Sequence, residues 1–144
     1  MRPVHTAGIE IGKLGPVLNL MYDVRFSDRQ WGLRAVAGFD VDPYVNVYQA
    51  GAGIYYLIGK KKHSLETGID FFYYAAEEVS DDQLALGFLF AVKDARSLYT
   101  SGNLGYRYTA NKSIIRIGIS QGYLFELKNY YTGAYISFAI KIGK

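Results

Sequence analysis

The alternation of apolar and polar residues in one segment after another is the feature that most limits the folds open to this chain. Between residues 115 and 120, for example, three isoleucines alternate with Arg116, Gly118 and Ser120. A period of two places successive side chains on opposite faces of an extended strand, whereas an amphipathic helix requires a period of about 3.6. No segment has a convincing helical period, and 14 Tyr and 8 Phe favour strands. The sequence therefore predicts an all-β fold.

Eight segments carry this alternation, and polar turns separate them. They are residues 7–12, 18–26, 33–41, 49–58, 65–74, 103–108, 115–120 and 134–142. Eight strands in up-and-down antiparallel order form the smallest common transmembrane β-barrel of bacterial outer membranes. The segment 84–92, LALGFLFAV, is apolar on both faces, so a ten-strand barrel is an open alternative. We expect residues 1–144 to form this single domain.

The two faces of the expected strands differ in charge. One face carries large apolar and aromatic side chains, while the other combines Gly, Ala and Ser with acids and bases. An unpaired charge that faces hydrocarbon near the bilayer midplane costs about 2–4 kcal/mol. We therefore expect the apolar face to contact lipid and the charged face to fill a narrow barrel with paired charges. The expected interior charges are Glu10, Asp23, Arg25, Arg34, Asp40, Glu66, Asp70, Arg107, Arg116 and Lys141.

Two alternatives stay open at this stage. A soluble, lipocalin-like barrel that binds a small apolar ligand would have the apolar face of every strand inside and the charged face in water. Alternation alone does not exclude this arrangement. A narrow pore would use the inward charges as an ion path, although a barrel of about eight strands is normally filled by side chains. The direction of three side chains distinguishes the soluble barrel from the membrane barrel. Only in a membrane barrel do Arg34, Glu66 and Arg116 point into the enclosed space.

Aromatic residues near the expected strand ends predict the two interfacial belts of a transmembrane barrel. Turn lengths alternate as well: residues 27–30, 60–63 and 109–112 are compact, whereas residues 42–48 and 75–97 are longer. Short periplasmic turns and longer external loops have this arrangement. We expect the bacterial outer membrane as the location and the lipid bilayer as a partner. The expected interfacial aromatics are Phe26, Trp31, Tyr48, Tyr56, Tyr73, Tyr99, Tyr108, Tyr123 and Tyr131.

The ends of the chain and its first connection complete the expected topology. Residues 1–8 lack the apolar stretch of a secretory signal, so an exported protein would be shown here in its mature form. An even number of strands is expected to place both termini on the periplasmic side. Residues 13–17, with the pair Gly15 and Pro16, are then expected to form a tight external loop.

The longest expected loop, residues 75–97, is the candidate partner-binding segment. Four acidic residues precede the apolar segment 84–92 in this loop, and long loops in compact folds are often functional. An ordered cap over the barrel mouth is an equally good interpretation. The expected partners are other outer-membrane proteins. The candidate contact residues are Glu77, Glu78, Asp81, Asp82, Leu86, Phe88 and Phe90.

Composition argues against several kinds of chemistry. The chain has no cysteine and only two histidines, His5 and His63, neither with a nucleophile arranged beside it as lipid-ester hydrolysis would require. No metal-ligand spacing or nucleotide-binding motif occurs. The net charge of +3 comes from scattered residues and gives little support for a nucleic-acid partner. We expect a non-enzymatic protein that needs no cofactor and no metal.

The sequence resembles the small outer-membrane barrel proteins of Gram-negative bacteria, of the eight-stranded OmpA/OmpX-like type, over essentially its whole length. The resemblance is most specific in AGAGIYYLIGKKKHSLETGIDF, residues 50–71, and in NLGYRYT, residues 103–109, which RIGIS follows at residues 116–120. These segments look like strand-turn-strand units of uncharacterised members of this group. The resemblance implies a fold and a membrane rather than a reaction.

Overall fold

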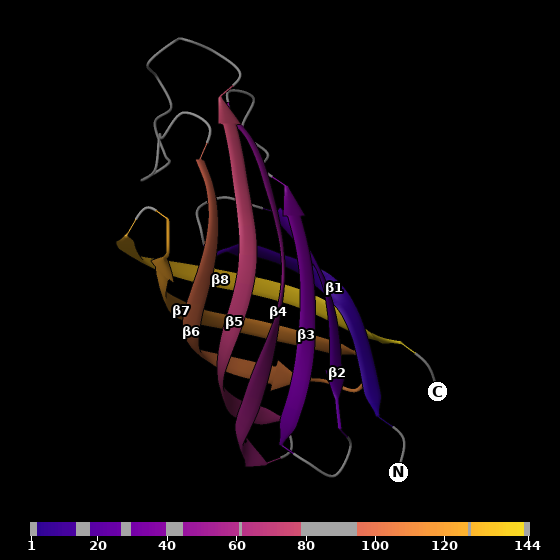
Figure 1. Ribbon diagram of the computed structural model, residues 1–144. Helices are drawn as coiled ribbons and strands as arrows, with labels where there is room; N and C mark the ends of the chain where they lie inside the picture. Colours follow the sequence, from indigo (N-terminus) through magenta and orange to yellow (C-terminus); the bar gives the residue numbers. More distant parts are fainter. Residues whose placement is uncertain are drawn as a thin grey trace.

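Eight antiparallel strands close into one barrel in chain order (Figure 1). The computed structural model describes residues 3–13, 18–26, 30–39, 45–60, 62–78, 95–126 and 128–142. The strands are β1 (Val4–Gly12), β2 (Leu18–Arg25), β3 (Trp31–Phe39), β4 (Val45–Lys60), β5 (His63–Glu78), β6 (Ala95–Thr109), β7 (Ser113–Leu124) and β8 (Asn129–Ile142). The predicted all-β, up-and-down antiparallel barrel is confirmed. The segment 84–92, on which the ten-strand alternative rested, lies outside the described residues.

The barrel closes through β1, which pairs with both β2 and β8. The strands are tilted relative to the barrel axis. If paired residues are followed from Val4 on β1 around the barrel through β2 to β7, the path arrives at Gly133 on β8. Gly133 packs against Lys13, just beyond the other end of β1, so the path does not return to the level at which it began. Closed barrels require such a tilt and stagger. No helix occurs among the described residues, and therefore none that is long and apolar enough to cross a membrane.

Strand lengths differ around the barrel. β4 and β5 have 16 residues each and β6 has 15, whereas β1, β2 and β3 have nine, eight and nine. The long strands make one side of the barrel taller than the rest (Figure 1). Their pairing continues to Val45 with Glu78 and to Ala76 with Ala95. The predicted bounds 49–58, 65–74 and 103–108 are therefore too short, because backbone pairing extends beyond the clear alternation of side chains.

The distribution of polarity is reversed relative to a soluble protein. Outward residues such as Leu20, Ile117 and Ile119 expose 56–58% of their surface, whereas the inward Glu10 and Arg116 expose 0% and 1%. Interior glycines make room for large neighbours: a Cβ on Gly53 would collide with the Asp70 carboxylate. The interior therefore combines small residues with long charged or aromatic ones, as a filled narrow lumen requires.

Candidate functional site

Eight charged side chains fill the middle of the barrel, and we call them the interior charge network. All are buried to 3% exposure or less, and they come from six strands and from Lys13, which follows β1. Four are acidic and four are basic, so the network is neutral at pH 7. Its members are Glu10, Lys13, Asp23, Arg34, Glu66, Asp70, Arg107 and Arg116.

Glu66 is the hub of the network. Its Oε1 lies 2.5 Å from Arg34 Nη2 and 3.0 Å from Arg116 Nη1, and its Oε2 lies 2.9 Å from Arg107 Nη1. One carboxylate thus accepts from three guanidinium groups carried by β3, β6 and β7. Charge-assisted hydrogen bonds of this kind are stronger than neutral ones. They offset the large cost of removing four charges from water.

Glu10 and Asp70 extend the network toward Lys13. Arg116 Nη2 donates to Glu10 Oε2 at 3.0 Å, and the other oxygen of Glu10 lies 3.3 Å from Lys13 Nζ. Lys13 Nζ also donates to Asp70 Oδ2 at 2.6 Å, and Asn103 Nδ2 donates to the same oxygen at 2.6 Å. The ion pairs therefore form one connected system that joins opposite walls of the barrel.

Tyr55 completes the other end of the network. Its hydroxyl donates to Asp23 Oδ1, while Arg107 Nη1 lies 3.3 Å from Asp23 Oδ2. The guanidinium groups of Arg34 and Arg107 lie over the Tyr55 ring, 4.9 and 5.2 Å from its centroid. Cation–π contacts stabilise desolvated cations. The arrangement neutralises and immobilises its charges, and it leaves no described carboxylate of the network without a cation within 3.3 Å.

An aromatic cluster covers the network on the side of the long strands. Phe72 stacks on Tyr99 at 4.9 Å between ring centroids, and Tyr99 meets Tyr131 edge to face at 5.8 Å. Tyr99 Oη donates to Gln49 Oε1 at 2.9 Å. Tyr99 and Tyr131 expose only 1% and 5% of their surface. Their assignment to the interfacial belts is therefore wrong: the strands extend past the predicted bounds, and at these positions their side chains face inward.

Lys13 is the network member that the sequence analysis missed. It was expected in an external loop, but it is 2% exposed and its ammonium lies 5.5 Å from the Phe72 ring centroid and 5.3 Å from that of Tyr135. Gly12 and Lys13 have φ values of 106° and 70°, which break the strand alternation and turn the lysine inward. The only signal in the sequence is a glycine before a lysine at a strand end, which is weak.

Gly133 allows the inward turn of Lys13, and its replacement is a test of that packing. A Cβ at Gly133 would collide with the Lys13 carbonyl oxygen. Gly133→Ala is expected to destabilise the barrel by about 1–3 kcal/mol, because overpacking forces the backbone to shift. Gly102→Ala is the matched control, since a Cβ there meets nothing within 4 Å. Urea unfolding in lipid vesicles measures both, and equal stability of the two variants would contradict the packing.

The remaining expected interior charges lie elsewhere. Arg25 and Lys141 are half-buried at the end of the barrel where β1 begins, and neither belongs to the interior charge network. Lys141 Nζ donates to the Ala110 carbonyl at 2.8 Å. Asp40 lies outside the described residues. The ten expected charges therefore divide into seven network members, two at the mouth and one that the structure does not describe.

The other expected interfacial aromatics lie on the outer wall. Phe26, Trp31, Tyr48 and Tyr73 are exposed, and Tyr56, Tyr108 and Tyr123 are partly exposed. At the end where β1 begins, Trp31 packs on Tyr56 at 4.8 Å. The two histidines lie at the same end: His5 Nδ1 hydrogen-bonds with the Tyr22 hydroxyl at 2.7 Å, and His63 Nδ1 with that of Tyr106 at 2.5 Å.

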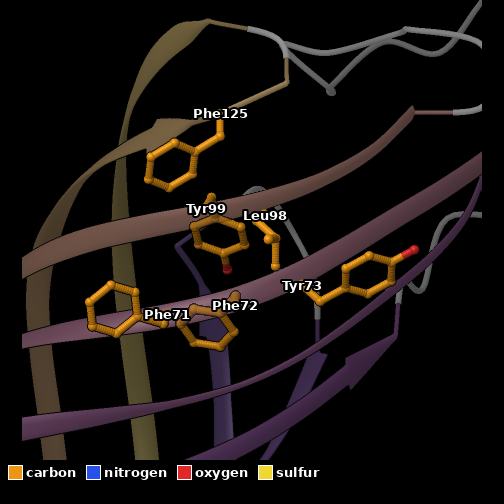
Figure 2. A pocket seen from close by; sticks show the side chains of 6 residues that line it. All are labelled: Phe71, Phe72, Tyr73, Leu98, Tyr99 and Phe125. Atoms are coloured by element: carbon orange, nitrogen blue, oxygen red, sulfur yellow. The ribbon is translucent and has the colours of Figure 1, made fainter.

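An apolar hollow of about 370 Å³ opens on the outer wall near the other end (Figure 2). Its lining includes Phe71, Tyr73, Leu98 and Phe125. Next to it, the exposed Glu126 accepts from Ser97 Oγ at 2.5 Å and from Leu98 N at 2.8 Å. The hydrogen bond from Ser97 lowers the pKa of this loop carboxyl below its ordinary value.

The candidate partner-binding residues are not described by the structure. Outside the described residues lie Asp81, Asp82, Leu86, Phe88 and Phe90, as do the side chains of Glu77 and Glu78.

A closed eight-stranded barrel with an apolar outer wall and a charge-filled interior is the fold of small outer-membrane β-barrel proteins. Three solved structures are similar to it. The N-terminal β-barrel domain of Pseudomonas aeruginosa OprF has a TM-score of 0.70 at 9% identity, over 97% of this chain and 96% of that one. Neisserial surface protein A has 0.55 at 11% identity, over 97% and 93%. The Yersinia pestis outer membrane protein Ail, solved in a phospholipid bilayer nanodisc, has 0.54 at 12% identity, over 98% and 100%.

Sequence comparison adds no family to this structural likeness. No protein-family model matches the chain, and no curated protein is significantly similar to it. The similarity to solved structures therefore establishes the fold, in agreement with the predicted resemblance to small eight-stranded outer-membrane barrels.

Proposed function

We propose that this protein is an integral barrel of the bacterial outer membrane and serves there as a non-enzymatic structural element. The observation that carries the proposal is the reversed polarity of the wall. Large apolar side chains such as Leu20, Ile117 and Ile136 are exposed around the barrel, while the ion pairs are inside. An apolar belt of this extent is unfavourable in water and stable against acyl chains.

The soluble, lipocalin-like carrier is the alternative that does not agree with this distribution of polarity. It required Arg34, Glu66 and Arg116 to point away from the enclosed space, but all three are buried inside the barrel and bonded to one another. The interior therefore holds a charge network where a lipocalin-like protein would hold an apolar ligand. These contacts support the membrane barrel over the soluble carrier.

A closed, structural barrel is also favoured over a narrow pore. The network spans the lumen from Asp23 on β2 through Glu66 on β5 to Glu10 on β1, with consecutive ion-pair distances of 3.3 Å or less. The aromatic cluster of Phe72, Tyr99 and Tyr131 lies beyond it. An ion would have to break several buried pairs to pass, at a high energetic cost. We therefore propose that the barrel does not conduct.

Cell fractionation and refolding test the proposal. The protein expressed with an export signal is expected in the outer-membrane fraction, and the folded barrel is expected to migrate differently from the boiled protein on a gel. Planar bilayers that contain the folded barrel are expected to show no conductance steps. Free solubility without detergent would contradict the membrane location, and regular conductance steps would contradict the closed interior. The prediction that residues 75–97 bind a partner stays a prediction.

A further inference from the structure

At the end of the barrel where β1 begins, two basic side chains have no ion-pair partner among the described residues. We call this end the terminal mouth and define it by Val4, Arg25 and Ile142. Arg25 on β2 and Lys141 on β8 lie in the inward-facing rows and are half-buried there. Arg25 forms no ion pair with a described residue, and it lies near enough to Lys141 for the two positive charges to interact. Two cations on either side of β1 are suited to sharing an anion.

The strand register places a hydroxyl group between the two cations. Val4 pairs with Arg25 across β1 and β2, and Thr6 pairs with Lys141 across β1 and β8. Thr6 is 1% exposed, and its Oγ1 hydrogen-bonds to no described residue. Buried hydroxyl groups normally have a partner. Asp23 lies in the same row, but it already accepts from Tyr55 and Arg107.

The described residues around the mouth supply no ion-pair partner to Arg25 or Lys141. Four of the described carboxylates belong to the interior charge network, and the fifth, that of Glu126, lies at the opposite end of the barrel. The rim turns add cations instead: Lys62 and Lys112 are both exposed. The two charges of Arg25 and Lys141 are therefore in excess within the described part of the chain.

We propose that the terminal mouth is a binding site for a phosphate group, held by Arg25, Lys141 and the Thr6 hydroxyl. A guanidinium presents a planar set of donors that matches two phosphate oxygens, and an ammonium adds a strong point charge. The phosphate group belongs either to the headgroup of an anionic phospholipid or to free phosphate. The headgroup source rests on the membrane location proposed above, whereas free phosphate requires only the folded barrel.

NMR titration of the folded barrel in phosphatidylcholine nanodiscs tests the site. In one arm, inorganic phosphate is added against sodium chloride of equal ionic strength. In the other, nanodiscs that contain phosphatidylglycerol replace pure phosphatidylcholine. We expect saturable shifts at the Arg25 side-chain Nε–H and at the Lys141 amide in at least one arm. A response in the first arm identifies free phosphate as a ligand, and a response confined to the second identifies the headgroup.

Two double variants separate a built site from diffuse attraction. R25Q with K141Q is expected to weaken the apparent affinity about tenfold or more, because charge-assisted contacts are lost. K62Q with K112Q removes the same charge from the rim and is expected to change the affinity less than about twofold. Equal loss in both variants would overturn the site.

The wild-type titration decides the matter by itself if the mouth variant does not fold. No shift at Arg25 and Lys141 in either arm would overturn the proposal. Failure of the membrane location would be recognised separately, as the absence of a folded barrel in the nanodiscs before any titration.

Discussion

Glu66→Gln is expected to destabilise the folded barrel by about 3–5 kcal/mol, the cost of breaking a buried ion pair from one side. Glutamine keeps the shape of the side chain but removes the charge that Arg34, Arg107 and Arg116 share within 3.0 Å. The network would then hold four cations and three carboxylates, so one buried positive charge would have no counter-charge. Urea unfolding of the barrel refolded into lipid vesicles, followed by the gel shift of the unboiled protein, measures the loss.

Two variants control for the Glu66 result. Glu126→Gln removes a carboxylate from the exposed loop after β7 and is expected to leave the stability nearly unchanged, because exposed charges are solvated and screened. The double variant Glu66→Gln with Arg34→Met restores neutrality inside the barrel and is expected to recover part of the lost stability, since a buried pair is often replaceable by apolar groups. If Glu66→Gln costs no more than Glu126→Gln, the hub role of Glu66 is refuted.

Ile117→Arg is expected to cost about 2–4 kcal/mol in a bilayer, the cost of an arginine on the lipid face near the midplane. Ile117 is 56% exposed on β7, and its neighbours on β6 and β8 are Tyr106 and Ile136. On a barrel in water the same arginine would be solvated and nearly neutral in free energy. The yield of inserted, folded barrel and its urea stability both report the difference.

Tyr130→Arg is the matched control for Ile117→Arg. Tyr130 is 70% exposed near the beginning of β8, at the level where the barrel wall meets the loops. The expected cost there falls to about 0–1 kcal/mol because the guanidinium reaches the interface. Similar small costs for both variants would argue that the outer wall does not face hydrocarbon.

Much of the fold could be predicted from residue alternation. Segments such as 115–120 gave the strand period, the number of strands and the side of each strand that carries charge. The inward placement of Glu10, Arg34, Glu66 and Arg116 follows from this period together with the cost of charge in lipid. This placement is predictable because strand periodicity and the exclusion of charge from lipid act on every residue of a strand, independently of its distant partners.

Other features could not be read from local patterns. Tyr99 and Tyr131 lie beyond the predicted strand bounds, and only the continued pairing of β6 with β5 and of β8 with β7 fixes them as inward residues. Lys13 turns inward through two positive φ angles, against the alternation of β1. Which acid meets which base is also tertiary information, since Glu66 and Arg116 are 50 residues apart in the chain.

The sequence by itself determined that the chain forms β-strands and that each strand has a charged face and an apolar face. It could do so because the direction of a side chain in a strand is a local property. Only the tertiary structure decided that four acids and four bases meet as one neutral network and that Arg25 and Lys141 remain outside it. The physical reason is that Coulomb interactions depend on distances across the lumen, and these are set by the tilt and register of the closed barrel.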